Sequence, residues 1–378
     1  MRNMMRTYGI PGGAVALVRD GKLFYARGFG YADLENKTPV EPDALFRIAS
    51  VSKPITSAAI MTLVQEGKLK LDDRVAPFIA YLTPAPGATV DPRWEQITIR
   101  HLLNHTAGWD RDKPNGGFDP IDRPAIAAAA VNAPAPASSE TLIRYMKGMP
   151  LDFNPGEAHV YSNFGYIILG RVIERVSGMP YEQYVRARVL QPVGANRTQQ
   201  GKSRMSGALP EEVKYYMPGA SLNFPMVQSV FPGGGIVPLN YGGYHLEAGD
   251  ASGAWVSSTI DLLRFVNGVD GRPNPPDILS PEIVSEMTGS GATSCNGSCY
   301  YAAGWVVRPV GSGATWWHGG DLPGTKSMLV RSYYNISWVA LFNAGAPPKF
   351  NGELDAALWD ALAGVTSFPT QDLFATFR

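Results

Sequence analysis

The sequence has very few cysteines, no long hydrophobic run and no excess of charge of either sign. Cys295 and Cys299 are the only cysteines among 378 residues. A structural zinc site needs four ligands, and no second cysteine or histidine pair has suitable spacing, so we expect no metal and no cofactor. The longest apolar stretches, such as residues 126–131, fall far short of the ~20 residues that cross a bilayer, so no membrane span is expected.

Charge excludes another class of protein. The 33 basic and 33 acidic residues cancel, and without a basic excess nucleic acid is not an expected partner. The first residues, Met-Arg-Asn-Met-Met-Arg, have no apolar core and do not form a signal peptide. The chain is therefore either cytosolic or a mature form whose leader is missing, and we favour a periplasmic or secreted location over a cytoplasmic one.

The two cysteines flank a short segment of turn-forming residues. Asn296, Gly297 and Ser298 lie between Cys295 and Cys299 and can close a small disulfide loop. The alternative is a pair of free thiols on a loop.

The length and the order of the elements predict one large unit with two lobes. Asp20-Gly21 separates two strand-like runs at residues 14–19 and 22–29, which is a strong hairpin signal because both turn residues favour positive φ. Further strands are expected at residues 304–309, 315–318, 327–331 and 337–343, and helices at residues 50–66, 98–104, 140–149, 166–176, 181–188, 258–267 and 353–363.

Strands at both ends with helices between them favour an α+β fold. We expect residues 1–70 and 300–378 to form an α/β lobe whose antiparallel sheet is built from both termini and flanked by helices. Residues 71–299 are expected to form a helical, loop-rich lobe, with the active site between the two.

Three short motifs carry the chemistry. The first is Ser50-Val51-Ser52-Lys53, at a predicted helix N-terminus. Residues three apart share a helix face, so the Lys53 amine can lie beside the Ser50 hydroxyl and act as its base. Taken alone, this motif is common, and Ser50 is equally explained as a helix N-cap.

The second and third motifs lie far along the chain. Tyr161-Ser162-Asn163 precedes an apolar helix, and His318-Gly319-Gly320 follows a strand. Glycines after a strand allow a substrate to approach the backbone closely. Without the first motif, Tyr161 and Asn163 are explained as a core tyrosine and a helix cap.

Together, in this order, the motifs resemble those of serine hydrolases of the class C β-lactamase and penicillin-binding-protein superfamily. The segments Ile10–Val15 and His101–Gly108 are similar to the first hairpin and to a helix-to-loop segment of that family, so the resemblance covers almost the whole chain. It implies the serine β-lactamase/DD-peptidase-like fold, with a small ester or amide as substrate, and it predicts no oligomeric state.

The resemblance also implies roles for single residues. Ser50 matches the nucleophile, Lys53 the neighbouring amine, Tyr161 a proton shuttle with a lowered pKa, and Asn163 the residue that positions Lys53. The backbone N–H groups of Ser50 and Asp321 match the oxyanion hole, while Trp109, Gly319 and Gly320 are expected to face the substrate. Either Lys53 or Tyr161 can be the general base.

His318 departs from the lysine of true class C β-lactamases. Histidine is mostly neutral at pH 7 and lacks the fixed charge that binds a β-lactam carboxylate. We therefore expect a carboxylesterase-like hydrolase in which His318 faces the cleft. The alternatives are a D-aminopeptidase, DD-peptidase or weak β-lactamase, an acyltransferase, or a scaffold of the same fold without turnover.

Overall fold

A computed structural model describes the chain except residues 115, 220–223, 290–293, 296 and 378 and the side chains of residues 294 and 295. Its centre is an antiparallel sheet in the order β3-β2-β1-β14-β13-β12-β11-β10-β9. The strands are β1 (Gly12–Arg19), β2 (Lys22–Asp33), β3 (Thr38–Pro39), β9 (Ser294–Cys295), β10 (Cys299–Ala302), β11 (Trp305–Val310), β12 (Gly313–Leu322), β13 (Thr325–Arg331) and β14 (Ile336–Phe342).

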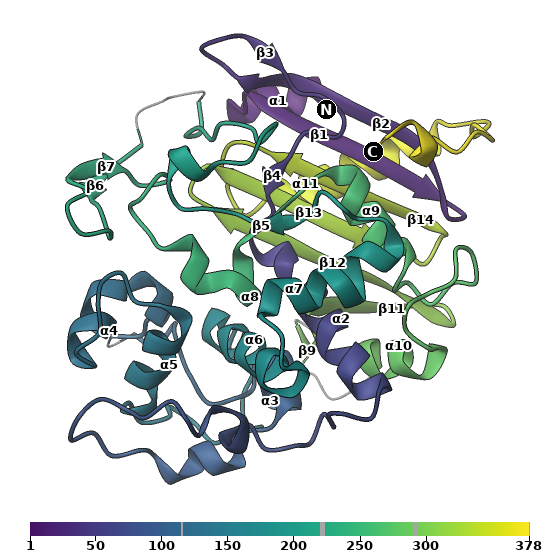
Figure 1. The fold of residues 1–378 in the computed structure, drawn as a ribbon. Coiled ribbons are helices and arrows are strands. Elements are labelled where there is room, and N and C mark those ends of the chain that lie inside the picture. Colours follow the sequence, from purple (N-terminus) through teal and green to yellow (C-terminus); the bar gives the residue numbers. More distant parts are fainter. Residues whose placement is uncertain (115, 220–223, 290–293, 296, 378) are drawn as a thin grey trace.

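The sheet joins the two ends of the chain. β1 pairs with β14 from Gly13↔Phe342 to Arg19↔Ile336, so the first and last long strands lie side by side (Figure 1). The predicted hairpin is confirmed: Arg19 pairs with Lys22, and Asp20 and Gly21 have φ values of 51° and 79°.

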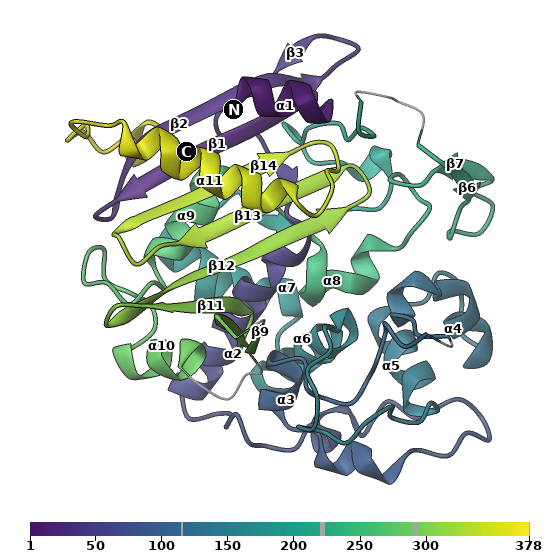
Figure 2. The same ribbon diagram turned by 180° about the vertical axis from the view of Figure 1, so that it is seen from behind.

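Helices cover both faces of the sheet. The α-helices of the described residues are α1 (Arg2–Tyr8), α2 (Ser52–Gln65), α3 (Ile99–Leu103), α4 (Pro124–Ala130), α5 (Ser139–Lys147), α6 (Asn163–Ser177), α7 (Tyr181–Val185), α8 (Asp250–Gly253), α9 (Thr259–Asn267), α10 (Pro281–Thr288) and α11 (Phe350–Ala363), and some of them cover the sheet. Figure 2 shows α1 and α11 on one face of the sheet, and α9 packs on β1 and β14 from the other. The α+β fold class is confirmed.

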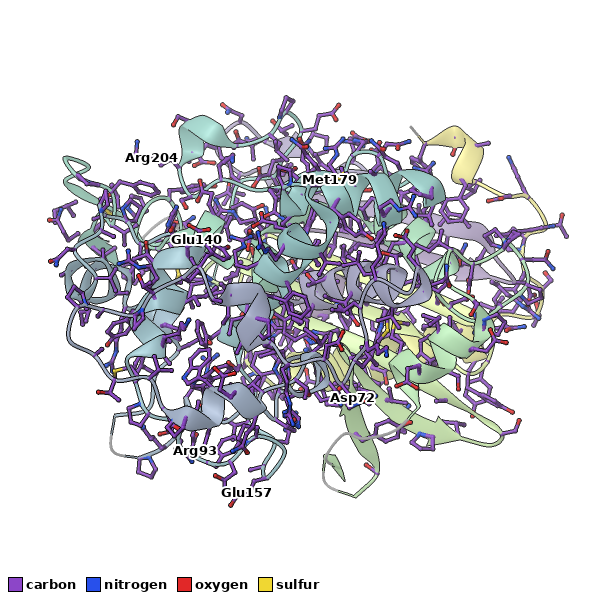
Figure 3. The ribbon with its side chains drawn as sticks, turned by 60° about the horizontal axis from the view of Figure 1, so that its bottom comes forward. Asp72, Arg93, Glu140, Glu157, Met179 and Arg204 are labelled. Carbon is purple, nitrogen blue, oxygen red and sulfur yellow. The ribbon has the colours of Figure 1, made fainter. Side chains whose placement is uncertain are left out.

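The remaining helices gather beyond the sheet. α6 is buried along most of its length and contacts α2, α3, α5 and α8. Figure 3 brings this end of the molecule forward and places Arg93 and Glu157 at its periphery. The division into residues 1–70 with 300–378 and residues 71–299 stays a prediction.

Short strands and loops complete the molecule. β4 (Phe46–Arg47), β8 (Trp255–Ser257) and β5 (Gln199–Gln200) form a small sheet, and β6 (Met226–Gln228) pairs with β7 (Ile236–Pro238). Among the described helices, none is long and apolar enough to cross a membrane. The described residues contain no cluster of His, Cys, Asp and Glu that could hold a metal ion.

Candidate functional site

Ser50 lies in a tight turn just before α2. It belongs to a 3₁₀ turn, Ala49–Val51, and α2 begins only at Ser52. Ala49 has a φ of 49°, a conformation that is strained for a residue with a side chain. Val51 occupies the N-cap position of α2 without a side-chain hydrogen bond. The helix-cap explanation of Ser50 is therefore wrong, and its hydroxyl is available for chemistry.

The Ser50 hydroxyl is bracketed by two polar side chains. Lys53 Nζ lies 3.1 Å from Ser50 Oγ, and the Tyr161 hydroxyl donates a hydrogen bond of 2.7 Å to the same oxygen. Ser50 is 111 positions from Tyr161 in sequence. The predicted meeting of the first and second motifs is therefore confirmed as geometry.

Two further acceptors fix the amine of Lys53. Lys53 Nζ donates to Asn163 Oδ1 at 2.8 Å and to the Ser252 carbonyl at 2.8 Å. A neutral amine has two N–H groups and one lone pair. With both N–H groups held by Asn163 and Ser252, the lone pair is directed at Ser50.

Burial favours the neutral form of the Lys53 amine. The Lys53 side chain has no exposed surface, and desolvation lowers its pKa to about 7, although the negative charge of Asp119 opposes the shift and Arg111 adds to it. Near neutral pH a large fraction of Lys53 is therefore unprotonated and able to accept the Ser50 proton.

Tyr161 behaves differently from the expectation. Burial raises the pKa of its hydroxyl, and the hydrogen bond to Ser50 only partly offsets this effect. The expected lowered pKa of Tyr161 is wrong, because desolvation and the negative charge of Asp119 penalise the phenolate more than the Ser50 hydrogen bond and Arg111 stabilise it. Tyr161 is thus a neutral proton donor in this site.

His318 is in the cleft but is not free to contact a substrate. It lines a hollow with Ser50 and Tyr161, yet only 5% of its surface is exposed. Its Nδ1 lies 2.6 Å from the Gly319 carbonyl, so Nδ1 carries the hydrogen, and its Nε2 accepts from the Tyr301 hydroxyl at 3.0 Å. The expected position of His318 at the cleft is confirmed. A hydrogen bond from its ring to a substrate is not available, because both ring nitrogens already have partners within the protein.

The same burial removes charge from His318. Desolvation, together with the positive charge of Lys53, lowers its pKa to about 3. The imidazole therefore stays neutral across the physiological range, and the hollow receives no positive charge from this position.

Of the two glycines after His318, Gly320 has no room for a side chain, whereas Gly319 faces only the movable end of a side chain. A Cβ on Gly320 would lie 2.4 Å from the Ile48 carbonyl oxygen, and one on Gly319 would lie 2.9 Å from Asn351 Nδ2. Ser327 also donates a hydrogen bond of 2.7 Å to the Ile48 carbonyl. β12 and β13 are thereby pressed against the turn that carries Ser50, and Asp321 lines the same hollows as Ser50.

Trp109 does not line the cleft. It is 5% exposed, and its ring packs 4.7 Å from Phe164 and 5.3 Å from Trp94. Its expected contact with substrate is wrong, because these neighbouring aromatic rings take it into the core.

Several residues of the site carried no sequence signal. Buried Asp119 accepts hydrogen bonds from the Asn163 backbone at 3.0 Å and from Arg111 at 3.2 Å, and thereby fixes the first turn of α6. Lys326, also buried, forms an ion pair of 2.7 Å with the exposed Asp321. Each lies in a segment without a motif, and only the folded chain brings them to Ser50.

The loop between the two cysteines is closed by a disulfide. β9 and β10 place the backbones of Cys295 and Cys299 opposite each other, and Cys299 is disulfide-bonded. The side chain of Cys295 lies outside the described part of the structure, but it is the only other cysteine of the chain.

Comparison with known proteins gives consistent matches. The family model described as Beta-lactamase matches residues 1–363. Penicillin-binding protein 4* of Bacillus subtilis (strain 168) is 30% identical over 332 residues, 84% of this chain and 65% of that protein. Esterase EstB of Burkholderia gladioli is 38% identical over 183 residues, 48% of this chain and 45% of that protein.

A solved structure matches over its whole length. D-amino acid amidase from Ochrobactrum anthropi SV3, complexed with L-phenylalanine, is similar with a TM-score of 0.71 and 25% identity, covering 97% of each chain. The chain thus spans less than two thirds of the length of the two curated relatives, and nearly all of this structure.

Proposed function

The chain belongs to the β-lactamase family, and on that premise we propose that it is a serine hydrolase that cleaves small esters or amides through an acyl-enzyme on Ser50. The observation that carries the proposal is the bracketing of Ser50 Oγ by Lys53 Nζ at 3.1 Å and the Tyr161 hydroxyl at 2.7 Å. An activated serine next to a base is the arrangement that nucleophilic catalysis requires.

Acylation begins with proton transfer from Ser50 to the neutral Lys53 amine. Ser50 Oγ attacks the substrate carbonyl, and the negative oxygen is held by the backbone N–H groups of Ser50 and Asp321. Such a donor typically contributes ~10²–10³ in rate. Tyr161 then protonates the leaving oxygen or nitrogen and regains its proton from the Lys53 ammonium, so the site returns to its starting protonation state.

Deacylation uses the same groups in reverse. Water takes the place of the leaving group, and its proton passes by way of the Tyr161 hydroxyl to the neutral Lys53 amine as its oxygen attacks the acyl carbonyl. The acyl–oxygen bond to Ser50 then breaks, and Lys53 returns a proton to Ser50 Oγ. In this account Lys53 is the general base, and Asn163 and the Ser252 carbonyl hold its amine in position. General acid–base groups of this kind contribute typically ~10²–10⁴ in rate.

The names of the relatives support both proposed substrate classes, esters and amides. One relative is named an esterase and another structure is named an amidase. The neutral, hydrogen-bonded His318 disfavours a substrate that needs a fixed positive charge there, which argues against strong β-lactamase activity. The complete set of Ser50, Lys53, Tyr161 and Asn163 argues against a scaffold without turnover.

An acyltransferase has the same first half-reaction. It differs only in which nucleophile breaks the acyl-enzyme. Added methanol during ester hydrolysis distinguishes the two, because a transferase forms the methyl ester in preference to the acid.

The proposal is tested with a fluorophosphonate probe and with p-nitrophenyl acetate. Wild-type protein should be labelled on Ser50 and should hydrolyse the ester, and Ser50→Ala should lose both properties. Ser206→Ala, which removes an exposed serine outside the cleft, should retain both. Equal labelling and turnover in Ser50→Ala would contradict the proposal.

A further inference from the structure

Two hollows meet at Ser50, and they differ in character. The first, which we call the apolar hollow, has a volume of about 360 Å³, and Arg111, Asp122 and Asp321 are the charged residues at its wall. Most of its large side chains are apolar: Ile121, Leu239, Tyr244, Leu246, Leu322 and Pro323. The polar hollow has a volume of about 560 Å³ and is lined by Tyr161, His318, Lys326 and Asn351. Ser50, Arg111, Asn163 and Asp321 line both hollows.

The position of Tyr161 indicates which part of the substrate lies in which hollow. Cleavage leaves the acyl group on Ser50, and the departing oxygen or nitrogen must receive a proton. Tyr161, the donor in the proposed mechanism, lines the polar hollow and is not among the residues that line the apolar one. The leaving group must therefore occupy the polar hollow, and the acyl group the apolar one.

On the basis of the proposed function, we propose that the acyl group of the substrate is uncharged and apolar, and that the wall formed by Leu239, Tyr244 and Leu246 selects it. This wall lies on the segment between β7 and α8 (Figure 1). The substrate class is thus an ester or amide of a hydrophobic carboxylic acid with a polar leaving group.

A buried arginine makes the wall rigid. Arg47 is 1% exposed, and its Nη1 donates to the Asn240 carbonyl at 2.8 Å and to the Tyr244 hydroxyl at 3.1 Å. Its Nη2 donates to the Lys202 carbonyl at 2.8 Å. Arg47 lies in β4, shortly before Ser50, so the wall is tied to the strand that leads to the nucleophile. A preformed wall avoids the cost of ordering on binding.

Two of the charged side chains at the apolar hollow are already paired with a residue of opposite charge. Arg111 pairs with Asp119 at 3.2 Å, and Asp321 pairs with Lys326 at 2.7 Å. Burial and the negative charge of Asp119 raise the pKa of Asp122, which the cations Arg111 and Arg123 partly oppose, so the charged form of this carboxyl is disfavoured. A negatively charged acyl group would enter a site that desolvates it without offering an unpaired cation.

Paired substrates test the acyl preference. We expect kcat/KM for p-nitrophenyl esters to rise from acetate to butanoate by about fourfold per added methylene, the value expected for full burial of that group. The hydrogen succinate ester, in which a carboxylate replaces the terminal methyl group of the butanoyl chain, should be poorer than butanoate. 3-Phenylpropanoyl p-nitroanilide should exceed D-phenylalanine p-nitroanilide, which differs only in its ammonium group.

Variants of the wall test which hollow holds the acyl group. Leu239→Trp should lower kcat/KM for p-nitrophenyl butanoate at least tenfold relative to acetate. Leu239→Ala, which carries no risk of overpacking, should shift the preference toward longer acyl groups. Leu358→Trp, the same change at a position on α11 outside both hollows, should leave the acyl profile unchanged.

The outcomes separate this inference from the proposed function. If Ser50-dependent hydrolysis occurs but the profile is flat, or a charged acyl group is preferred, the inference alone is overturned. It is also overturned if Leu239→Trp discriminates hexyl acetate from ethyl acetate and not one acyl group from another, because the orientation is then reversed. Absence of Ser50-dependent hydrolysis of every ester overturns both.

Discussion

Lys53 Nζ lies 3.1 Å from Ser50 Oγ, and the lysine side chain has no contact with solvent. A lysine at this distance is a useful base only when it is unprotonated. Its burial lowers the pKa to about 7, and the Asn163 and Ser252 oxygens hold the amine so that its lone pair is directed at the serine.

The pH dependence of kcat/KM should therefore show an acidic limb near pH 7. Below that pH Lys53 is protonated and cannot accept the Ser50 proton, so the rate falls about tenfold per pH unit. Asp119→Asn should move the midpoint to lower pH, because the Asp119 charge raises the Lys53 pKa.

The control for that shift is Asp360→Asn, which removes an exposed carboxylate on α11 and should leave the midpoint in place. A rate that stays constant from pH 8 to pH 5 would exclude Lys53 as the base. His318 cannot produce the limb, since its pKa is lowered to about 3.

Tyr161→Phe should lower kcat/KM, which reports acylation, on an ethyl ester by about 10²-fold, because the change deletes the proton donor and keeps the ring. The loss on a p-nitrophenyl ester should be much smaller, since p-nitrophenolate leaves without a proton. Stopped-flow or steady-state rates on the two esters give the comparison. Equal losses on both esters would exclude Tyr161 as the donor to the leaving group. The control is Tyr334→Phe, which makes the same change at an exposed tyrosine.

His318→Lys should raise the ratio of kcat/KM for a carboxylate-bearing cephalosporin to that for a neutral ester, because a permanent positive charge replaces a neutral ring. His318→Gln supplies a polar, uncharged control that should not raise the ratio. We expect both variants to lose some overall activity, because both ring nitrogens of His318 are hydrogen-bonded. A ratio of two substrates in the same variant cancels this general loss. An unchanged ratio in His318→Lys would show that position 318 does not contact the substrate carboxylate.

The disulfide at Cys299 supports our proposal of a periplasmic or secreted location, because disulfides persist in oxidising compartments. Intact mass with and without reductant, followed by alkylation, should show one bond between Cys295 and Cys299. Its contribution to stability should be small, since the loop-closure entropy falls with loop length. Two free thiols in protein purified from an oxidising compartment would contradict the pairing.

Local signals in the sequence were enough to predict the main elements. The Asp20-Gly21 turn, with positive φ at both residues, forms as expected. The spacing of Ser50 and Lys53 also predicted their contact, although α2 begins two residues later than expected. These predictions succeeded because they depend on neighbouring residues.

The predictions that failed depend on burial and on distant partners. The pKa of Tyr161 follows from its desolvation, and the hydrogen bonds of His318 follow from Tyr301 on a neighbouring part of the sheet. The Ser252 carbonyl, 199 positions from Lys53, is a backbone atom that no side-chain pattern marks. A sequence motif identifies the reacting groups, whereas their protonation depends on the packed surroundings.

The central claim is an acyl-enzyme on Ser50, and rapid-quench mass spectrometry during turnover of p-nitrophenyl butanoate tests it most directly. The account predicts a mass increase equal to one butanoyl group on the peptide that contains Ser50, and no increase in Ser50→Ala. Turnover with an adduct on a different residue, or undiminished turnover in Ser50→Ala, would contradict it.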